Sequence, residues 1–303
     1  MAAMNTSRRR ALTQITQLAG LGGLALTASA FVAGLGAARS AHAQTASAPA
    51  TDADTDTALQ AAISGAHRSA ANRARDGARH PFETLRFFGL QPQHSVVELT
   101  PGAGWYTEIL APYLREKGRL YEAHFARDSE SVGRRRARAN FEARLAKEPA
   151  LYDRVVVGSL PGAAGFTDIK PPGGADSVLT FRNVHNWLAD DSLDAMLRAC
   201  YALLKPGGVL GVVDHRAAPG STVKQMMDSG YVSEALMEER ARAAGFALAA
   251  RSAINANPRD TKDHPGGVWQ LPPSLSGKDV GRDKYLAIGE SDRFTHRYVK
   301  PRG

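Results

Sequence analysis

Hydrophobic and polar positions follow two different periods along residues 58–303. Short apolar runs rich in β-branched residues predict strands, and apolar residues spaced three or four apart predict helices. The predicted strands cover residues 95–99, 119–125, 154–157, 175–181, 209–213, 246–252 and 293–299. The predicted helices cover residues 58–76, 105–116, 127–147, 192–204 and 232–244, with Pro81 in the first turn of a further helix that ends near Leu90.

Strands that alternate with helices in this way predict an α/β fold built on a mostly parallel sheet. In a doubly wound sheet of this kind, ligands bind where the carboxyl ends of the strands meet. The segment over residues 255–274 is long, polar and proline-rich. A loop of that length is interpreted either as a lid over the site or as a surface insertion that covers a sheet edge.

The first 43 residues have the pattern of a cleavable signal peptide. Ser7-Arg-Arg-Arg-Ala-Leu12 precedes an apolar stretch rich in Gly and Ala, and Ala41-His-Ala43 offers a small-x-small cleavage site. The paired arginines resemble a twin-arginine signal. The alternative is a membrane anchor, which the Gly and Ala content and the cleavage site argue against. We therefore expect export through the twin-arginine machinery to the periplasm, without stable membrane insertion.

Residues 44–57 are predicted to be a disordered leader, and residues 58–303 a single domain whose helices over 58–90 precede the sheet. The net charge of +8 falls to +4 without the four arginines of the signal. No dense basic stripe with interleaved aromatic residues appears, so nucleic acid is not an expected partner. The single cysteine, Cys200, lies in an apolar helical pattern and is predicted to be a buried thiol without a disulfide.

A glycine turn after the first predicted strand is the strongest local signal. Glu98-Leu-Thr-Pro-Gly-Ala-Gly104 places Gly102 and Gly104 where the backbone can approach a ligand closely. A dinucleotide-binding turn would need a third glycine, and a phosphate-binding P-loop would need lysine where Trp105 stands. The remaining interpretation is a cofactor whose amino-acid end rests on the turn.

Several further segments support a resemblance to a known family. They are Phe181-Arg-Asn-Val-His-Asn-Trp187, Leu204-Lys-Pro-Gly-Gly208, Asn255-Ala-Asn-Pro-Arg-Asp-Thr-Lys-Asp263 and Gly289-Glu-Ser-Asp-Arg293. With the turn, they resemble a class I S-adenosylmethionine-dependent methyltransferase, and more narrowly a bacterial family of exported methyltransferases. The resemblance implies a seven-stranded, mostly parallel Rossmann-like sheet with helices on both faces and an antiparallel last strand. It implies S-adenosylmethionine as cofactor and a small molecule as methyl acceptor.

The same resemblance implies which residues bind the cofactor. They are Glu98, Thr100, Gly102, Gly104, Trp105, Glu122, His124 and Asn183. Thr100 replaces the first glycine of the family pattern, and because threonine tolerates β geometry, the first strand is expected to extend through it. His124 occupies the position of the acid that normally holds the ribose, and Glu122 or Asp128 is the expected substitute. Trp105 either contacts the sulfonium of the cofactor through its ring or packs the helix that begins there against the sheet.

Three polar residues after two neighbouring strands are the candidate catalytic groups. His185 follows the fourth predicted strand, and Asp214 and His215 follow the fifth. Because methyl transfer depends mainly on positioning, a histidine would act as base only where the acceptor must lose a proton. The alternative is that these residues anchor loops. A metal is not expected, because the Asp214-His215 spacing matches no strong ligand motif.

Two other functions remain open from sequence. One is a methyltransferase fold that has lost activity and binds a ligand in the periplasm, which the compartment and the missing ribose acid favour. The other is a metal-dependent hydrolase, which depends only on the histidines.

Overall fold

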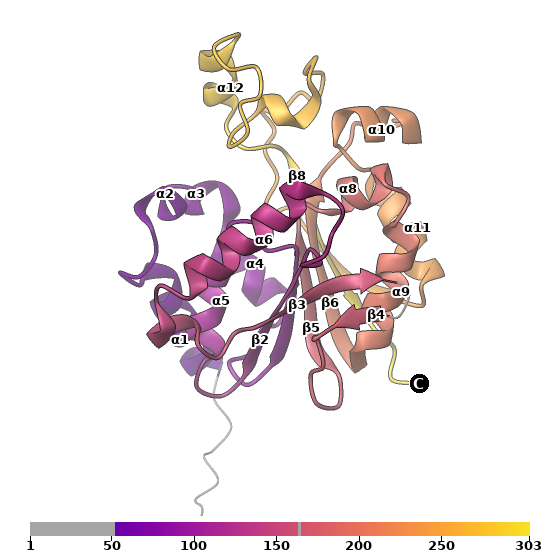
Figure 1. Ribbon diagram of the computed structural model, residues 1–303. Helices are drawn as coiled ribbons and strands as arrows, with labels where there is room; N and C mark the ends of the chain where they lie inside the picture. Colours follow the sequence, from indigo (N-terminus) through magenta and orange to yellow (C-terminus); the bar gives the residue numbers. More distant parts are fainter. Residues whose placement is uncertain (1–51, 163–164) are drawn as a thin grey trace, which may run out of the picture. The chain divides into compact units, whose positions relative to one another are not determined.

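One eight-stranded sheet forms the centre of the protein, seen in the computed structural model (Figure 1), which describes residues 52–162 and 165–303. The strand order is β4-β3-β2-β1-β5-β6-β8-β7. The strands are β1 (Ser95–Leu99), β2 (Arg119–His124), β3 (Val156–Gly162), β4 (Gly165–Thr167), β5 (Ala175–Phe181), β6 (Leu204–His215), β7 (Ala247–Ser252) and β8 (Arg293–Val299). The five strands β3, β2, β1, β5 and β6 are parallel to one another.

The antiparallel pairs lie at the two sides of the sheet. β8 runs antiparallel to both β6 and β7, as the resemblance implied for the last strand. The expected count of seven strands is wrong, because the short strand β4 pairs antiparallel with β3 at the other edge. β4 covers only three residues, too few to produce a readable alternation of polar and apolar positions.

From residue 52 onward, four helices precede β1. They are α1 (Asp52–Ser64), α2 (Ala70–Arg73), α3 (Asp76–Arg79) and α4 (Pro81–Phe87). The single helix predicted over residues 58–76 is therefore wrong: Ser69 caps a new helix by accepting a hydrogen bond from the Asn72 N–H. α1 begins at Asp52, inside the predicted leader, and the signal peptide lies outside the described residues. Pro81 occupies the first turn of α4, as predicted.

Each face of the sheet is covered by its own set of helices. On one face, α1, α4, α5 (Thr107–Leu114), α6 (Val132–Leu145) and α7 (Pro149–Tyr152) share an apolar core that includes Leu85, Leu110 and Phe141. On the other face, α8 (Val184–Ala189), α9 (Leu193–Leu203) and α11 (Glu234–Ala243) pack through residues such as Leu197 and Met237. This is the doubly wound arrangement that the alternating pattern predicted, and Cys200 is fully buried within it.

Loops and short helices gather beyond the carboxyl ends of the parallel strands (Figure 1). They include α10 (Val223–Ser229), the 3-10 helix η1 (Gly267–Gln270) and α12 (Arg282–Ile288). The buried carboxylate of Asp260 anchors this segment, because it accepts hydrogen bonds from the Tyr231 hydroxyl and from the Asp292 backbone N–H at 2.8 Å. The segment over residues 255–274 is thus fixed at this edge of the sheet.

Within residues 52–162 and 165–303, no helix has the length and apolar character required to span a bilayer.

Candidate active site

The turn after β1 leaves the strand in a left-handed conformation. Thr100 has φ 51°, Gly102 φ 62° and Gly104 φ 84°. β1 therefore ends at Leu99, and the expectation that it extends through Thr100 is wrong. A β-branched residue in this region of φ is strained, so the turn itself, anchored by the Thr100 N–H to the Ala123 carbonyl at 2.8 Å, imposes the conformation.

The two glycines of the turn have different surroundings. A methyl group added at Gly102 would meet no atom within 4 Å, so the backbone there faces open space. A methyl group added at Gly104 would lie 2.5 Å from the Arg144 guanidinium and 3.2 Å from the Phe141 ring. Arg144, on α6, donates hydrogen bonds to the Ala103 and Gly104 carbonyls and pairs with Glu108. Gly102 is therefore the position where a ligand can approach the backbone.

A cavity of about 580 Å³ opens beside this turn. It lies at the carboxyl ends of β1, β2, β3 and β5, and such a volume suits a cofactor-sized ligand. Two of the predicted cofactor-binding residues, Thr100 and Asn183, line it, together with Phe125, Leu160 and Trp187. A second cavity, of about 440 Å³, lies between α1 and α5 and is lined by none of the predicted site residues.

Asn183 joins the turn to the next strand. Its side-chain amide donates to the Leu99 carbonyl at 2.9 Å and to the Thr180 hydroxyl at 3.2 Å. Both donors are used inside the protein, so the amide oxygen is left for a ligand in the cavity. Trp187, on α8, contributes both to the apolar core and to the cavity wall.

Glu98 and Glu122 face each other in the interior rather than the cavity. They are directly paired in the β1–β2 register, and both side chains are buried. The Oε2 of Glu98 and both carboxylate oxygens of Glu122 find no hydrogen-bond donor among the described residues unless a proton is shared between the two groups. Burial raises the pKa of Glu98 to about 8, although the neighbouring Glu122 and Thr107 side chains and the charge of Arg79 oppose this shift. Burial, and then the charge of Glu98, raises the pKa of Glu122 well above its ordinary value.

His124 is also placed in the interior. Its side chain is fully buried, with the ring 5.2 Å from the Phe141 ring. Its Nδ1 accepts a hydrogen bond from the Phe125 N–H at 2.8 Å. Burial, followed by the charge of Arg138, lowers the pKa of His124 to about 4, so the ring is neutral at pH 7. At the end of β2, the residue in the cavity wall is Phe125.

Trp105 packs against arginines of the protein itself. The Arg79 and Arg68 guanidinium groups lie 4.7 and 5.1 Å from its ring centroid, and its Nε1–H donates to the Asn72 carbonyl at 2.9 Å. The neighbouring Tyr106 stacks on Phe181 with ring centroids 3.5 Å apart. The aromatic pair therefore links the turn to α2, α3 and β5.

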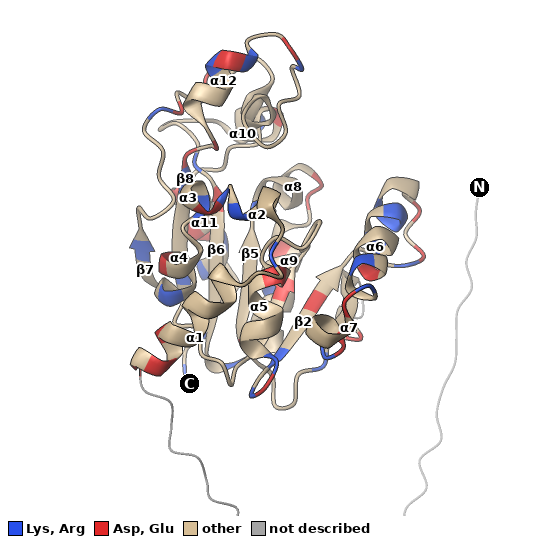
Figure 2. Cartoon of the chain, turned by 90° about the vertical axis from the view of Figure 1, so that its left-hand side faces the viewer, with Lys and Arg blue, Asp and Glu red and all other residues tan. Residues whose placement is uncertain are grey.

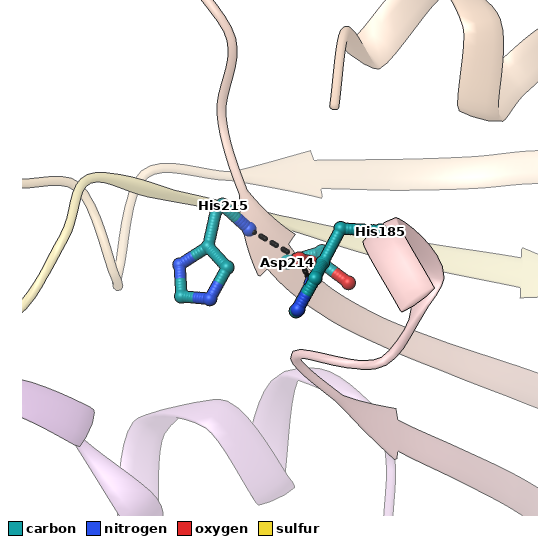
Figure 3. A group of neighbouring side chains, drawn as sticks. All are labelled: His185, Asp214 and His215. Atoms are coloured by element: carbon teal, nitrogen blue, oxygen red, sulfur yellow. Dashed lines mark hydrogen bonds and ion pairs between the residues drawn. The ribbon is translucent and has the colours of Figure 1, made fainter. Parts of the chain in front are cut away.

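The three predicted catalytic residues are brought together at the ends of β5 and β6 (Figure 3). Asp214 is fully buried, and its Oδ1 lies 3.0 Å from His185 Nδ1. The carboxylate also accepts the backbone N–H groups of Val184 at 2.6 Å and His215 at 2.7 Å. Because a carboxylate can only accept, Nδ1 of His185 donates this hydrogen bond, and Nε2 is the ring nitrogen that Asp214 does not contact.

His215 lies beside His185, with ring centroids 5.0 Å apart. Its Nδ1 is 2.5 Å from the Ser291 hydroxyl. Burial lowers the pKa of His215 well below its ordinary value, and the charges of His185 and Arg182 lower it further. His215 is therefore neutral at pH 7 and can take part in hydrogen bonds in either direction.

The donor atoms of His185, Asp214 and His215 lie within 4.8 Å of one another, close enough to consider a metal. Both oxygens of Asp214 already accept hydrogen bonds, and three arginines lie near enough to act on His215: Arg182, Arg293 and Arg79. That positive charge disfavours a cation. The expectation of no metal stays a prediction.

Sequence reasoning did not find Arg144 or Phe125. Arg144 is one of several arginines on a charged helix, and nothing in its spacing indicates that its side chain covers the glycine turn. Phe125 directly follows His124, so its place in the cavity wall was available from the predicted end of β2.

No protein-family model and no functionally curated protein matches the sequence. Solved structures do match the fold. A protein assigned as a sarcosine dimethylglycine methyltransferase from Galdieria sulphuraria is 15% identical, with a TM-score of 0.50 over 76% of this chain and 85% of that chain. The 4+2 cyclase SpnF is 18% identical, with a TM-score of 0.50 over 82% and 94%. A SAM-dependent methyltransferase from Aquifex aeolicus is 14% identical, with a TM-score of 0.49 over 81% and 98%.

The protein therefore has the Rossmann-like fold found in S-adenosylmethionine-dependent methyltransferases. At these identities the likeness establishes the fold alone, and one of the neighbours is described as a cyclase. The activity must be argued from the site.

Proposed function

We propose that the protein transfers a methyl group from S-adenosylmethionine to a small-molecule acceptor. The observation that carries this proposal is the turn after β1: its backbone is open at Gly102, and its Thr100 lines a cavity of about 580 Å³ at the carboxyl ends of the strands. Ligands bind at this edge in doubly wound sheets. Several solved structures that share the fold are of S-adenosylmethionine-dependent methyltransferases.

The residues present fit the cofactor in two regions. The turn at Thr100 and Gly102 offers bare backbone for the methionine end, and Phe125, Leu160 and Trp187 provide an apolar wall for an adenine ring. Glu122, expected to hold the ribose, faces Glu98 instead. The acid in the cavity wall is Asp190, so Asp190 is the group best placed to accept hydrogen bonds from ribose hydroxyls.

When bound, the cofactor supplies an electrophilic methyl group on a sulfonium. The protein then has to hold the nucleophile of the acceptor in line with the methyl–sulfur bond. It also has to remove a proton where that nucleophile carries one. His185 Nε2 is the proposed base. Asp214 holds the imidazole in the required tautomer and stabilises the imidazolium that forms, in the manner of an aspartate–histidine pair.

Isothermal titration of the purified protein with S-adenosylmethionine tests the proposal directly. Gly102→Val should abolish the heat of binding, because its side chain enters the space that the ligand needs. The matched control is Gly173→Val, since Gly173 also has positive φ and open surroundings but precedes β5 at the opposite edge of the sheet. No heat for the wild type near millimolar cofactor, or equal affinities in all three proteins, would contradict the proposal. Binding without methyl transfer to any acceptor would favour a ligand-binding protein.

We also propose that the protein is exported by the twin-arginine route. The support is the Ser7-Arg-Arg-Arg-Ala-Leu12 segment and the cleavage pattern at Ala41-His-Ala43. Replacing Arg8 and Arg9 with lysine should retain the full-length chain inside the cell, which cell fractionation measures. Unchanged processing in that variant would contradict this route.

A further inference from the structure

Three arginines contact one glutamate where α3 meets the start of β8, and the charge of a fourth acts on the same carboxylate. The Glu290 carboxylate accepts from Arg75 Nε at 2.8 Å, Arg79 Nε at 3.1 Å and Arg293 Nη1 at 3.0 Å. Arg182 completes the group, since its charge acts on Glu290 as well. We refer to Arg75, Arg79, Arg182 and Arg293 as the arginine cluster. Basic segments gather around α3 and β8 in Figure 2.

The arginine cluster has more positive charge than its surroundings neutralise. Arg79 and Arg293 are each only 3% exposed. Burial, and then the charge of Arg182, lowers the pKa of Arg79 to about 9. Burial likewise lowers the pKa of Arg182 to about 10, with Glu290 and Asp214 the acids that oppose the shift. An excess of buried positive charge of this kind is costly unless an anion neutralises it.

Several nitrogens of the cluster also lack a hydrogen-bond acceptor. Arg75 Nη2, Arg79 Nη2 and Arg293 Nε are buried without a partner among the residues that the structure describes. The side chain of Arg182 makes neither a hydrogen bond nor an ion pair with that part of the chain. Buried donors in native proteins are almost always satisfied, so the excess charge and the unused donors point independently to a binding site for an oxyanion.

The arginine cluster adjoins the candidate catalytic histidines. Arg182 directly precedes Asn183 and Val184, and its backbone N–H donates to the Val213 carbonyl at 2.7 Å. Arg293 is the register partner of His215 across the β6–β8 pair. Arg79, from the helices before the sheet, is close enough for its charge to act on His215. An oxyanion held here would place the rest of its molecule beside His185.

We propose that the arginine cluster binds an oxyanion group, a carboxylate or a phosphate, on the methyl acceptor. The guanidinium fork matches either group with paired hydrogen bonds. This rests on the proposed methyl transfer, and it narrows the acceptor to small anionic molecules that present a nucleophile to His185. The carboxylate of the cofactor is the other possible source of the same chemistry, so the experiment has to separate the two.

The first measurement is thermal unfolding in sodium acetate or inorganic phosphate against sodium chloride at equal ionic strength. In the wild type, at least one oxyanion should raise Tm more than chloride does. Arg182→Gln should need at least tenfold more oxyanion for the same rise, while its Tm in chloride should not be lower than that of the wild type, because a positive charge without an ion-pair partner is removed from beside three other arginines. Arg242→Gln, the same change at an exposed position of α11, should respond like the wild type.

Three outcomes would overturn the oxyanion site. They are no effect of acetate or phosphate beyond chloride, an equal response in Arg182→Gln, and a lower Tm of Arg182→Gln in chloride, which would make Arg182 a structural residue. Acetate and phosphate responses of different strength would identify the group that the site prefers.

The second measurement separates the acceptor from the cofactor. Isothermal titration of Arg182→Gln should give an S-adenosylmethionine affinity within about twofold of the wild type. If Arg182→Gln weakens S-adenosylmethionine but not its decarboxylated analogue, the arginines hold the cofactor carboxylate and the acceptor assignment is wrong. If the wild type responds to oxyanions but binds no cofactor, the oxyanion site stands while the proposed function and the acceptor assignment both fail.

Discussion

At the scale of single residues, Thr100 shows how the turn overrides local preference. Its φ of 51° places a β-branched residue in the left-handed region, at a cost of about 1–2 kcal/mol. The sequence favoured an extended Thr100 because threonine prefers strands, and nothing local indicated that the backbone must turn there. Gly102 and Gly104, which favour the turn, were recognised from the sequence because glycine adopts positive φ readily.

Thr100→Gly should therefore stabilise the protein. Relief of the strained φ outweighs the greater freedom that glycine gives the unfolded chain, so the free energy of unfolding should rise by about 0.5–1 kcal/mol. Urea unfolding measures this. Thr100→Ala keeps a side chain at positive φ and should show no comparable gain; an equal gain in both variants would place the effect in the threonine side chain rather than in the backbone.

Other site residues could not be placed from their own positions in the chain. Glu98 and Glu122 were assigned to the cofactor, yet the β1–β2 register sets them opposite each other in the interior. That pairing depends on which residues of two separate strands align, and on which side of the sheet α5 lies. The convergence of His185, Asp214 and His215 was easier to predict, because the three residues lie at the carboxyl ends of two adjacent parallel strands.

At the scale of elements, the helices before β1 fit closely onto the sheet. Phe88, just beyond α4, lies over Gly211 in β6, and a methyl group added at Gly211 would be 2.8 Å from the Phe88 ring and from Leu179. Only a glycine leaves room for the aromatic ring there. This contact fixes the segment that supplies Arg75 and Arg79 to the site.

Gly211→Ala should destabilise the protein by about 1–3 kcal/mol, because a rigid ring and a packed leucine have to move. Gly77→Ala is the matched control: Gly77 lies in α3 with no atom within 4 Å of the added methyl, and alanine there should stabilise by about 0.5–1 kcal/mol. Denaturant unfolding compares the two. If Gly211→Ala is as stable as the wild type, the close approach of Phe88 does not hold in solution.

The strands of the sheet could be predicted more fully than its helices. Strand residues 95–99, 175–181 and 293–299 were predicted with the bounds observed, because buried parallel strands form clear apolar runs between turn residues. The helices over residues 52–90 were not resolved into four pieces. The ends of these helices depend on capping residues such as Ser69 and on contacts with the sheet. The spacing of apolar residues along the sequence does not indicate either of them.

At the scale of the whole molecule, buried carboxyl groups give stability an unusual dependence on pH. Glu98 has a pKa of about 8 in the folded protein against about 4.5 in the unfolded chain. A group with a raised pKa stabilises fully below its unfolded pKa, and this contribution is lost as the pH rises through the folded value. His124 acts in the opposite direction, but only below pH about 6.5, where an unfolded histidine gains a proton.

Between pH 6.5 and 8, His124 does not oppose the loss of stability that results from the raised pKa of Glu98. The free energy of unfolding should fall by about 1.4 kcal/mol per pH unit for each proton that the folded protein binds and the unfolded chain does not. For one carboxyl group this amounts to about 2 kcal/mol between pH 6.5 and 8. Glu98→Gln removes one of the two buried carboxyl groups and should make the slope shallower, whereas Glu239→Gln, exposed on α11, should leave it unchanged. Urea unfolding at several pH values measures the slope. A flat wild-type profile would mean that Glu98 is ionised in the folded state.

The position of β8 has a consequence for biosynthesis. Residues Arg293–Val299 insert between β6 and β7, although both of those strands are translated earlier. Until the ribosome has released Val299, β7 has no neighbour in the sheet and one side of β6 remains open. Any quality-control step that distinguishes finished chains from unfinished ones could therefore monitor the arrival of this one strand.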